Sequence, residues 1–236
     1  MTKGQYRCPQ LALLRLQSWL SPAFPTGSYS YSHGLEWAVG AGYIKDRETL
    51  VDWLEADLCY GSVRNEAIFF CEAWCSARDN DFAKLLETAE LAAAFRGTSE
   101  FALEASQQAS ACRATLRRVW PNRLLDSLSQ LLSEREVPFV LSVILGVRSA
   151  REDVPISLAL PAFLQSYVAN SVTAGVRLIP LGQTDGQLAI AELEEAVLTV
   201  SARARNATMD DVGSAAFIVD LASMAHETQY TRLFRS

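Results

Sequence analysis

Apolar residues recur every three or four positions along most of this 236-residue chain. The clearest apolar stripe consists of Phe82, Leu85, Leu86, Ala89 and Ala93, and charged residues occupy several of the positions between them. This spacing places the apolar side chains on one face of an α-helix and the charged side chains on the other. Strand-like alternation is nearly absent from the chain. The pattern therefore predicts an all-α protein.

The same criteria predict a single-domain bundle of about ten helices. Asp46 is the expected N-cap of a helix with a stripe at Leu50, Leu54 and Leu58, which continues through residues 67–74. Besides the stripe at residues 82–93, further helices are expected at residues 10–20, 33–41, 98–119, 122–134, 138–149, 156–178, 184–205 and 211–227. Thr184 and Gln187 have the spacing of a capping box for one of them.

Nothing in the sequence divides the chain into two domains. It contains no Gly/Ser-rich linker and no repeat of solenoid length. Residues 137–147 could form a strand by periodicity alone, but no other segment offers that strand a partner. We therefore expect one all-helical domain over residues 1–236, with mobile tails at residues 1–9 and 227–236.

Composition narrows the class of protein. Hydrophobic residues make up 50% of the chain and charged residues 20%, which is typical of a globular domain. The formal net charge of -6 provides no general attraction for nucleic acid. Five cysteines cannot all pair, and the first residues lack an apolar signal-peptide stretch, so we expect a cytoplasmic protein. Residues 154–176 carry no charge, but their prolines and polar residues favour a buried helix over a membrane span.

The segment SPAFPTGSYSYSHGLE, residues 21–36, interrupts the helical pattern. Its prolines and glycines predict a rigid loop, with Ser32 capping a helix that starts near His33 and with Glu36 one turn further on the same face. A hydrolase with Ser30 or Ser32 as nucleophile and His33 as base is one alternative. The segment lacks the second glycine of a nucleophile elbow, however, so an ordered structural loop is favoured.

Metal binding is a second possible function. The chain has two histidines, His33 and His226, and Cys71 and Cys75 lie one helical turn apart. Neither histidine belongs to a cluster of ligands, and the two cysteines lie on or beside an apolar stripe, so core packing is favoured. A site completed by a second copy of the chain stays open.

The C-terminal segment HETQYTRLFRS, residues 226–236, combines arginines with aromatic and aliphatic residues and has no acidic residue after Glu227. Arginine and aromatic side chains are typical of the residues that dominate protein interfaces. Packing on its own domain and docking of a partner are both open for this tail. A connection at residues 177–187 has glycines but lacks the P-loop pattern, so nucleotide binding by this chain is not expected.

Three of these segments carry a resemblance to a known family. SPAFP followed by Gly27 and SYSHGLE at residues 30–36, LGQTDGQ at residues 181–187, and HETQY with RLFRS at the C-terminus are similar to motifs of the urease accessory protein UreF family. The resemblance spans nearly the whole chain. It implies a helical, dimeric protein that is not an enzyme and that acts as a scaffold, or chaperone, in assembly of the urease nickel centre.

The resemblance also implies partners. Members of the family bridge the GTPase UreG to UreD on the urease apoprotein, and nickel and GTP act through these partner proteins. For this chain we therefore expect no bound cofactor or metal, and a partner-binding surface built from these residues: Tyr31, His33, Glu36, His226, Glu227, Tyr230, Arg232, Phe234 and Arg235. A nickel carrier using His33, His226 or the pair Cys71 and Cys75, and a small serine hydrolase, are the two alternative functions.

Overall fold

The computed structural model describes residues 8–235, and this range contains only helices, turns and extended connections. It holds twelve α-helices and two 3₁₀ turns, Ser28–Ser30 and Met209–Asp211, so the predicted all-α class is confirmed. The α-helices are α1 (Pro9–Leu20), α2 (Leu35–Gly40), α3 (Arg47–Tyr60), α4 (Ser62–Asp79), α5 (Phe82–Ala94), α6 (Ser99–Val119), α7 (Arg123–Glu134), α8 (Leu141–Arg151), α9 (Ile156–Leu178), α10 (Gln183–Glu192), α11 (Glu194–Ala204) and α12 (Phe217–His226).

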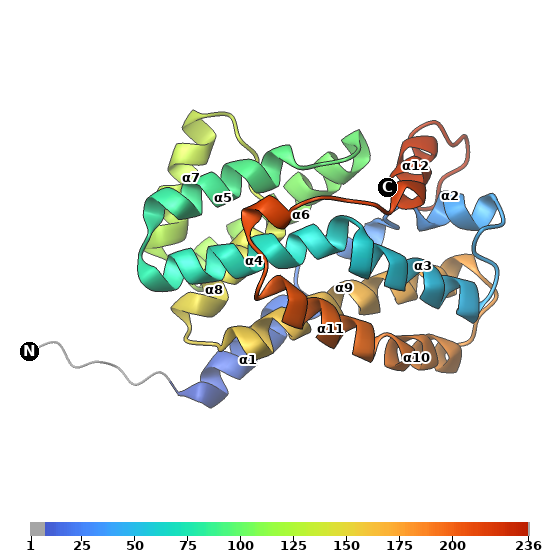
Figure 1. Cartoon of the computed structure of the whole chain (residues 1–236), viewed down its shortest axis with the longest axis horizontal. Coiled ribbons are helices and arrows are strands. Elements are labelled where there is room, and N and C mark those ends of the chain that lie inside the picture. Colours follow the sequence, from blue (N-terminus) through green and yellow to red (C-terminus); the bar gives the residue numbers. More distant parts are fainter. Residues whose placement is uncertain (1–7, 236) are drawn as a thin grey trace, which may run out of the picture.

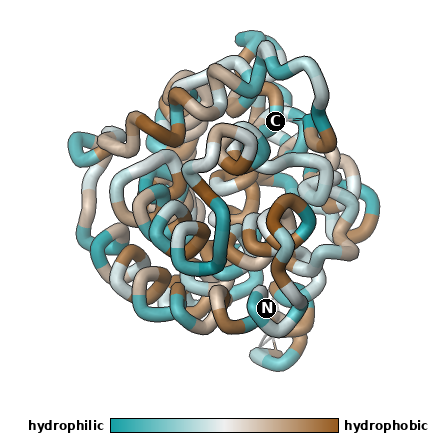
Figure 2. Tube along the Cα trace, turned by 90° about the vertical axis from the view of Figure 1, so that its right-hand side faces the viewer, coloured by the Kyte–Doolittle hydropathy of each residue, from teal (hydrophilic) through white to brown (hydrophobic). Residues whose placement is uncertain are grey.

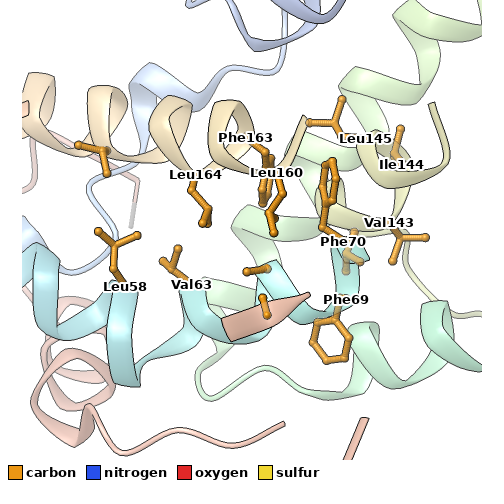
Figure 3. Packing of buried hydrophobic residues seen from close by; sticks show 14 of the residues in the cluster. Leu58, Val63, Phe69, Phe70, Val143, Ile144, Leu145, Leu160, Phe163 and Leu164 are labelled. Carbon is orange, nitrogen blue, oxygen red and sulfur yellow. The ribbon is translucent and has the colours of Figure 1, made fainter. Parts of the chain in front are cut away.

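Helix α4 is the centre of the bundle. It packs against α8, α5, α3, α9 and α11, so most of its side chains are buried (Figure 1). Phe70 of α4 stacks on Phe163 of α9 with ring centroids 5.1 Å apart (Figure 3). A Cβ atom on Gly146 of α8 would lie 2.6 Å from the backbone oxygen of Phe70, so only glycine allows α8 to approach α4 this closely.

The buried apolar side chains form one cluster that extends from α1 to the C-terminal segment. The tube in Figure 2 changes between hydrophobic and hydrophilic within single helical turns, as expected for helices that each turn one face to a shared core. Helix α9 corresponds to the long uncharged segment, and it is a core helix with Ala159, Leu164 and Val168 fully buried. No helix in the described range is long and apolar enough to cross a membrane.

Several helices begin where local chemistry predicts. The side chain of Asp46 accepts a hydrogen bond of 2.9 Å from the N–H of Thr49, which confirms Asp46 as the N-cap of α3. Asp81, Thr98 and Asn122 cap α5, α6 and α7 in the same way. Each cap satisfies a backbone donor that a helix N-terminus otherwise leaves without a partner.

Three predicted helix boundaries are wrong. The stripe from residue 50 to residue 74 belongs to two helices, because the chain turns at Gly61. Residues 184–205 also form two helices, α10 and α11, with fully buried Leu193 at the bend between them. The last helix begins at residue 217 instead of 211, because residues 212–216 are not helical and the N–H of Ala215 donates to the backbone oxygen of Tyr60.

The capping of two helices also differs from the prediction. At α10 the N–H of Gly182 donates to the carboxylate of Asp185 at 3.1 Å, so Thr184 and Gln187 do not form the capping box. Helix α2 begins at Leu35 because His33 and Gly34 have φ angles of 56° and 80°. These values lie in the left-handed region, which a right-handed helix cannot include.

Candidate functional site

The loop of residues 21–36 lies between α9, α6 and the C-terminal segment. Three of its backbone oxygens accept hydrogen bonds from other elements: that of Ser28 from Asn170 of α9 at 3.2 Å, that of Tyr29 from Arg177 of α9 at 3.1 Å, and that of Ser30 from the N–H of Arg235 at 2.8 Å. The Tyr31 hydroxyl is hydrogen-bonded to Gln107 of α6. The loop is therefore ordered by its neighbours, as the structural interpretation of its sequence predicts.

His33 is the centre of a polar cluster at the end of this loop. Its imidazole stacks on Phe101 of α6 with centroids 4.1 Å apart. Nε2 lies 3.1 Å from the Ser62 hydroxyl and 3.5 Å from the carboxylate of Asp57, and Nδ1 lies 3.5 Å from the carboxylate of Glu104. Burial opposes the charged imidazolium, but the hydrogen bond to Glu104 and the two carboxylates outweigh it and raise the pKa of His33.

The fully buried Asp57 ties this cluster to the helices. It accepts hydrogen bonds from the N–H of Ser62 at 3.0 Å and from the hydroxyl of Tyr167 at 2.6 Å. Burial and the neighbouring Asp57 carboxylate raise the pKa of Tyr167 well above its usual range, so the phenol stays a hydrogen-bond donor. Asp57 therefore joins the α3–α4 turn to α9, with His33 of the loop beside it.

The geometry around His33 does not match the hydrolase alternative. The hydroxyl beside the imidazole belongs to Ser62, whereas the hydroxyl oxygen of Ser32 accepts the N–H of Glu36 at 3.3 Å. Glu36 does not orient His33 either, since its carboxylate is 3.2 Å from His226. The predicted shared face of His33 and Glu36 is thus wrong, because His33 precedes the helix.

A second polar cluster, which we call the tail anchor, consists of Glu36, Glu100, His226 and Arg232. His226 is fully buried between two carboxylates, with Nδ1 at 2.9 Å from Glu100 and Nε2 at 3.2 Å from Glu36. Arg232 donates to the other oxygen of Glu100 at 3.1 Å. The four residues come from α2, α6, α12 and the C-terminal segment, so the anchor joins parts of the chain that are far apart in sequence.

The tail anchor also holds the backbone of the C-terminal segment. The N–H groups of Leu233 and Phe234 donate to the two oxygens of Glu36 at 2.6 and 2.8 Å. The ring of Phe234 is buried, and the guanidinium of Arg177 lies 4.4 Å from its centroid. Contacts of Arg232, Leu233 and Phe234 therefore hold the C-terminal segment on the domain, while Ser236 and residues 1–7 of the predicted tails lie outside the described residues. Mobility of either tail stays a prediction.

Helix α12 has an unusual distribution of side chains. Its buried face carries small or polar residues: Ala222, Ser223 and His226 are fully buried, with Val219 beside them. The Ser223 hydroxyl is 2.7 Å from that of Thr98. Its outer face consists of four large apolar residues, Phe217, Ile218, Leu221 and Met224, of which Phe217 is 69% exposed and Leu221 55% exposed.

Close packing explains the small residues on the inner face. A Cβ atom on Gly34 would lie 3.1 Å from the backbone nitrogen of Ser223 and 3.4 Å from the Cβ of Ala222, so the turn before α2 lies directly against α12. A surface helix usually turns its large apolar residues inward. Helix α12 turns them outward, next to the tail, where Tyr230 is fully exposed and Leu233 is largely exposed. The two segments together form an exposed apolar surface.

The predicted partner-binding residues divide into two groups. Tyr31, Glu36, His226 and Phe234 are buried, and His33 is partly buried, so these side chains support the surface from within. The remaining four, Glu227, Tyr230, Arg232 and Arg235, are exposed. Their role in partner binding stays a prediction.

Sequence reasoning missed several residues that build this region. The outer face of α12 was visible as a periodic pattern at residues 217, 218, 221 and 224, but the sequence does not reveal which face of a helix meets the core. Asp57, Glu100 and Glu104 carried no local signal, because their partners in space are distant in the chain.

The described residues contain no group of three or more His, Cys, Asp or Glu side chains that could hold a metal ion. Cys71 is buried, and desolvation raises the pKa of its thiol to about 12, which opposes the thiolate that binds metals. Cys75 is exposed at the surface, but partial desolvation of its thiol and the nearby Glu72 carboxylate raise its pKa as well. The structure therefore offers no support for the nickel-carrier alternative within this range.

Comparison with known proteins adds independent evidence. The family model described as UreF matches residues 44–194. The chain is 47% identical to the urease accessory protein UreF of Bradyrhizobium diazoefficiens over 225 residues, which cover 95% of this chain and 92% of the relative. It is 46% identical to the protein of the same name from Rhodopseudomonas palustris strain BisB5, over 95% of this chain and 91% of the relative. The chain therefore belongs to the UreF family of urease accessory proteins.

Proposed function

We propose that this protein is a scaffold of urease maturation, which bridges UreD and UreG on the urease apoprotein during GTP-dependent insertion of nickel. The relatives are named as accessory proteins of urease, so the chain is an accessory protein and not an enzyme. In this proposal the protein acts in the cytoplasm as a homodimer, and nickel and GTP are bound by its partners. Its own contribution is a set of docking surfaces.

The outer face of α12 is the observation that carries the proposal. Four large apolar side chains are exposed on a helix whose inner face is small and polar, beside the exposed Tyr230 of the tail. Fully burying a side chain of this size contributes about 1.5–3 kcal/mol, so a partner that covers this face gains several kcal/mol. We assign UreD to the surface formed by α12 and the tail.

The tail anchor explains how this surface is held ready for a partner. Glu36 and Glu100 fix the backbone and the Arg232 side chain of the tail through hydrogen bonds of 2.6–3.1 Å. Ordering the tail before binding lowers the entropic cost of docking. The buried residues that we predict to take part in partner binding therefore act by positioning the exposed ones.

A pair of matched substitutions tests the proposal. Leu221→Asp places a charge on the outer face of α12, and Leu198→Asp places one on α11 at a leucine that is 61% exposed. Each tagged variant is expressed with the urease operon, and the amount of co-purified UreD and the urease activity are measured. We expect the α12 variant to lose both, whereas the α11 variant resembles the wild type.

In a second variant residues 227–236 are deleted, so the tail is absent while the sequence of α12 is unchanged. We expect it to lose UreD as well, because Tyr230, Arg232 and the Glu36-bound backbone are absent. Full retention of UreD and of urease activity by both the deletion and Leu221→Asp would contradict the assignment. Circular dichroism of each purified variant confirms that the helical fold is intact.

A further inference from the structure

A cluster of four arginines lies where α6 ends and α7 begins. We call Arg113, Arg117, Arg118 and Arg123 the arginine cluster. All four fall within eleven residues of a chain whose formal net charge is -6. Among the described residues, Arg117 makes the cluster's only ion pair, a contact of 3.9 Å with the exposed Asp126. The cluster is therefore a local excess of positive charge on an acidic protein.

A groove of about 640 Å³ between α6 and α7 adjoins this cluster. Arg113 and Arg117 line one side of the groove, and its other side carries hydrogen-bonding side chains from α7: Asp126, Ser127, Ser129, Gln130, Ser133 and Glu134. Two guanidinium groups, three hydroxyls and an amide outnumber the two carboxylates. The groove thus offers more donors than negative charges, which suits a ligand that supplies acceptor oxygens.

Helix stability explains only part of the cluster. Arg117 and Arg118 occupy the last turn of α6, where a positive charge is favourable to the helix dipole. Arg123 is the first residue of α7, where the helix dipole disfavours a cation. An arginine at this position gains from a nearby anion that compensates both its own charge and the dipole.

The cluster is remote from the surface formed by α12 and the tail. Helix α6 connects the two places, since Glu100 near its N-terminus contacts His226 and Arg117 lies near its C-terminus. At 1.5 Å per residue, these two positions are about 25 Å apart along the helix. Figure 1 shows α12 and α7 at opposite sides of the molecule.

We propose that the arginine cluster is a second docking surface, which binds an acidic segment of a protein partner. This inference rests on the proposed scaffold function. It adds a second partner-binding surface, and α6 is the rigid spacer between the two partners. Guanidinium groups pair with the carboxylates of Asp and Glu in bidentate geometry. A stretch of alternating acidic side chains fits a groove lined by Arg113 and Arg117 on one wall and by serine hydroxyls on the other.

Nucleic acid is the less suitable occupant. Phosphate backbones are bound through many cationic contacts, and single strands also stack on exposed aromatic rings. The aromatic residue at this end, Trp120, is only partly exposed, and its ring packs edge-on against Trp19 at 6.1 Å between centroids. The rest of the protein is strongly acidic and repels a long polyanion, whereas a short acidic peptide contacts the cluster alone.

The test measures binding of a fluorescein-labelled ten-residue peptide of alternating Glu and Ala to the full-length protein by fluorescence anisotropy. The charge-reversal variant carries Arg117→Glu and Arg118→Glu. Its matched control carries Arg203→Glu and Arg205→Glu, two exposed arginines near the end of α11 with the same total change in charge. Measurements at 50 and 300 mM NaCl separate screened electrostatic binding from other modes.

We expect the charge-reversal variant to weaken peptide binding at least about tenfold and the control to change it less than about threefold, as loss of specific ion pairs requires. Absence of peptide binding to the wild type, or equal weakening by the two variants, would overturn the proposal. A labelled twenty-nucleotide single strand that binds more tightly than the peptide would also overturn it, in favour of a nucleic-acid surface.

The same variants separate this inference from the scaffold proposal. Leu221→Asp is expected to leave peptide binding unchanged, and Arg117→Glu with Arg118→Glu is expected to leave co-purification of UreD unchanged. If the peptide binds as expected while the α12 variant retains UreD, the arginine surface stands and the assignment of UreD to α12 fails. If UreD is lost only from the α12 variant and the peptide never binds, the assignment of UreD to α12 stands and the arginine surface fails.

Discussion

Glu36→Gln is the most informative single substitution in the tail anchor. The change keeps the size of the side chain but replaces one carboxylate oxygen by an NH₂ group. In the native protein the two oxygens accept the N–H groups of Leu233 and Phe234 at 2.6 and 2.8 Å. Glutamine can accept at one of these positions, and its NH₂ group then faces a backbone donor at the other.

The size of the effect follows from these contacts. A hydrogen bond to a charged group contributes about 1.5–3 kcal/mol, and the substitution removes one and weakens the other. We expect the free energy that holds the tail in place to fall by about 3 kcal/mol, which corresponds to about a hundredfold faster hydrogen exchange. These bonds hold only the C-terminal segment, at one end of the buried cluster, so the midpoint of global unfolding should change less than the exchange of the tail.

The assay is amide hydrogen exchange at residues 228–235, followed by mass spectrometry of a C-terminal peptide. Glu87→Gln on the exposed face of α5 makes the same chemical change away from the tail and serves as the control. The control should exchange like the wild type. Unchanged protection of Leu233 and Phe234 in Glu36→Gln would refute the conclusion that this carboxylate holds the tail.

Three further predictions concern the domain that supports the surface. The pKa of His33 is raised above its unfolded value of 6.5, so the stability that His33 contributes is complete below that pH and is lost as the pH rises through the higher folded pKa. Urea unfolding of the wild type between pH 5.5 and 9 should show this decrease in stability. An equal decrease in the His33→Gln variant would contradict the prediction. Gly61→Ala should destabilise the fold by about 2–4 kcal/mol, because the added Cβ would lie 2.0 Å from a carboxylate oxygen of Asp57. Alanine can adopt the backbone φ of -101° found at this position, so the clash and not the backbone causes the loss. A thermal midpoint equal to that of the wild type would show that Asp57 moves aside freely. Phe70→Ala should lower the free energy of unfolding by about 3–5 kcal/mol, as measured with denaturant, because the ring is fully buried against Phe163. A decrease below about 1 kcal/mol would mean that the core collapses around the cavity.

Periodicity and local capping chemistry predict most of the helical framework. The stripe at residues 82–93 is α5, and Asp46 caps α3 because both signals depend only on neighbours in the chain. The predicted helix boundaries are wrong where contacts between residues that are distant in the chain determine the structure. The chain turns at Gly61, where the buried Asp57 accepts the N–H of Ser62, and an N-cap cannot be recognised when its side chain comes from the preceding helix.

The candidate site was predictable as a set of segments but not as a constellation. The loop at residues 21–36 and the tail at residues 226–236 both stand out in the sequence, and the structure brings them together. Among the bonds that connect them, the one from the N–H of Leu233 to Glu36 spans 197 residues and leaves no local trace in the sequence. The orientation of α12 leaves no local trace either. Large apolar residues on one face of a helix give the same period whether that face points to the core or to solvent.

Solvent accessibility of α12 in the assembled complex tests the central claim most directly. Single cysteines are introduced at Leu221 on α12 and at Leu198 on α11, and the rate of maleimide labelling at each site is read by mass spectrometry with and without UreD. We expect UreD to slow labelling at position 221 at least about tenfold and to leave position 198 unchanged, because a docked partner excludes solvent from the face that it covers. Equal labelling of position 221 in the free and UreD-bound protein would contradict the account.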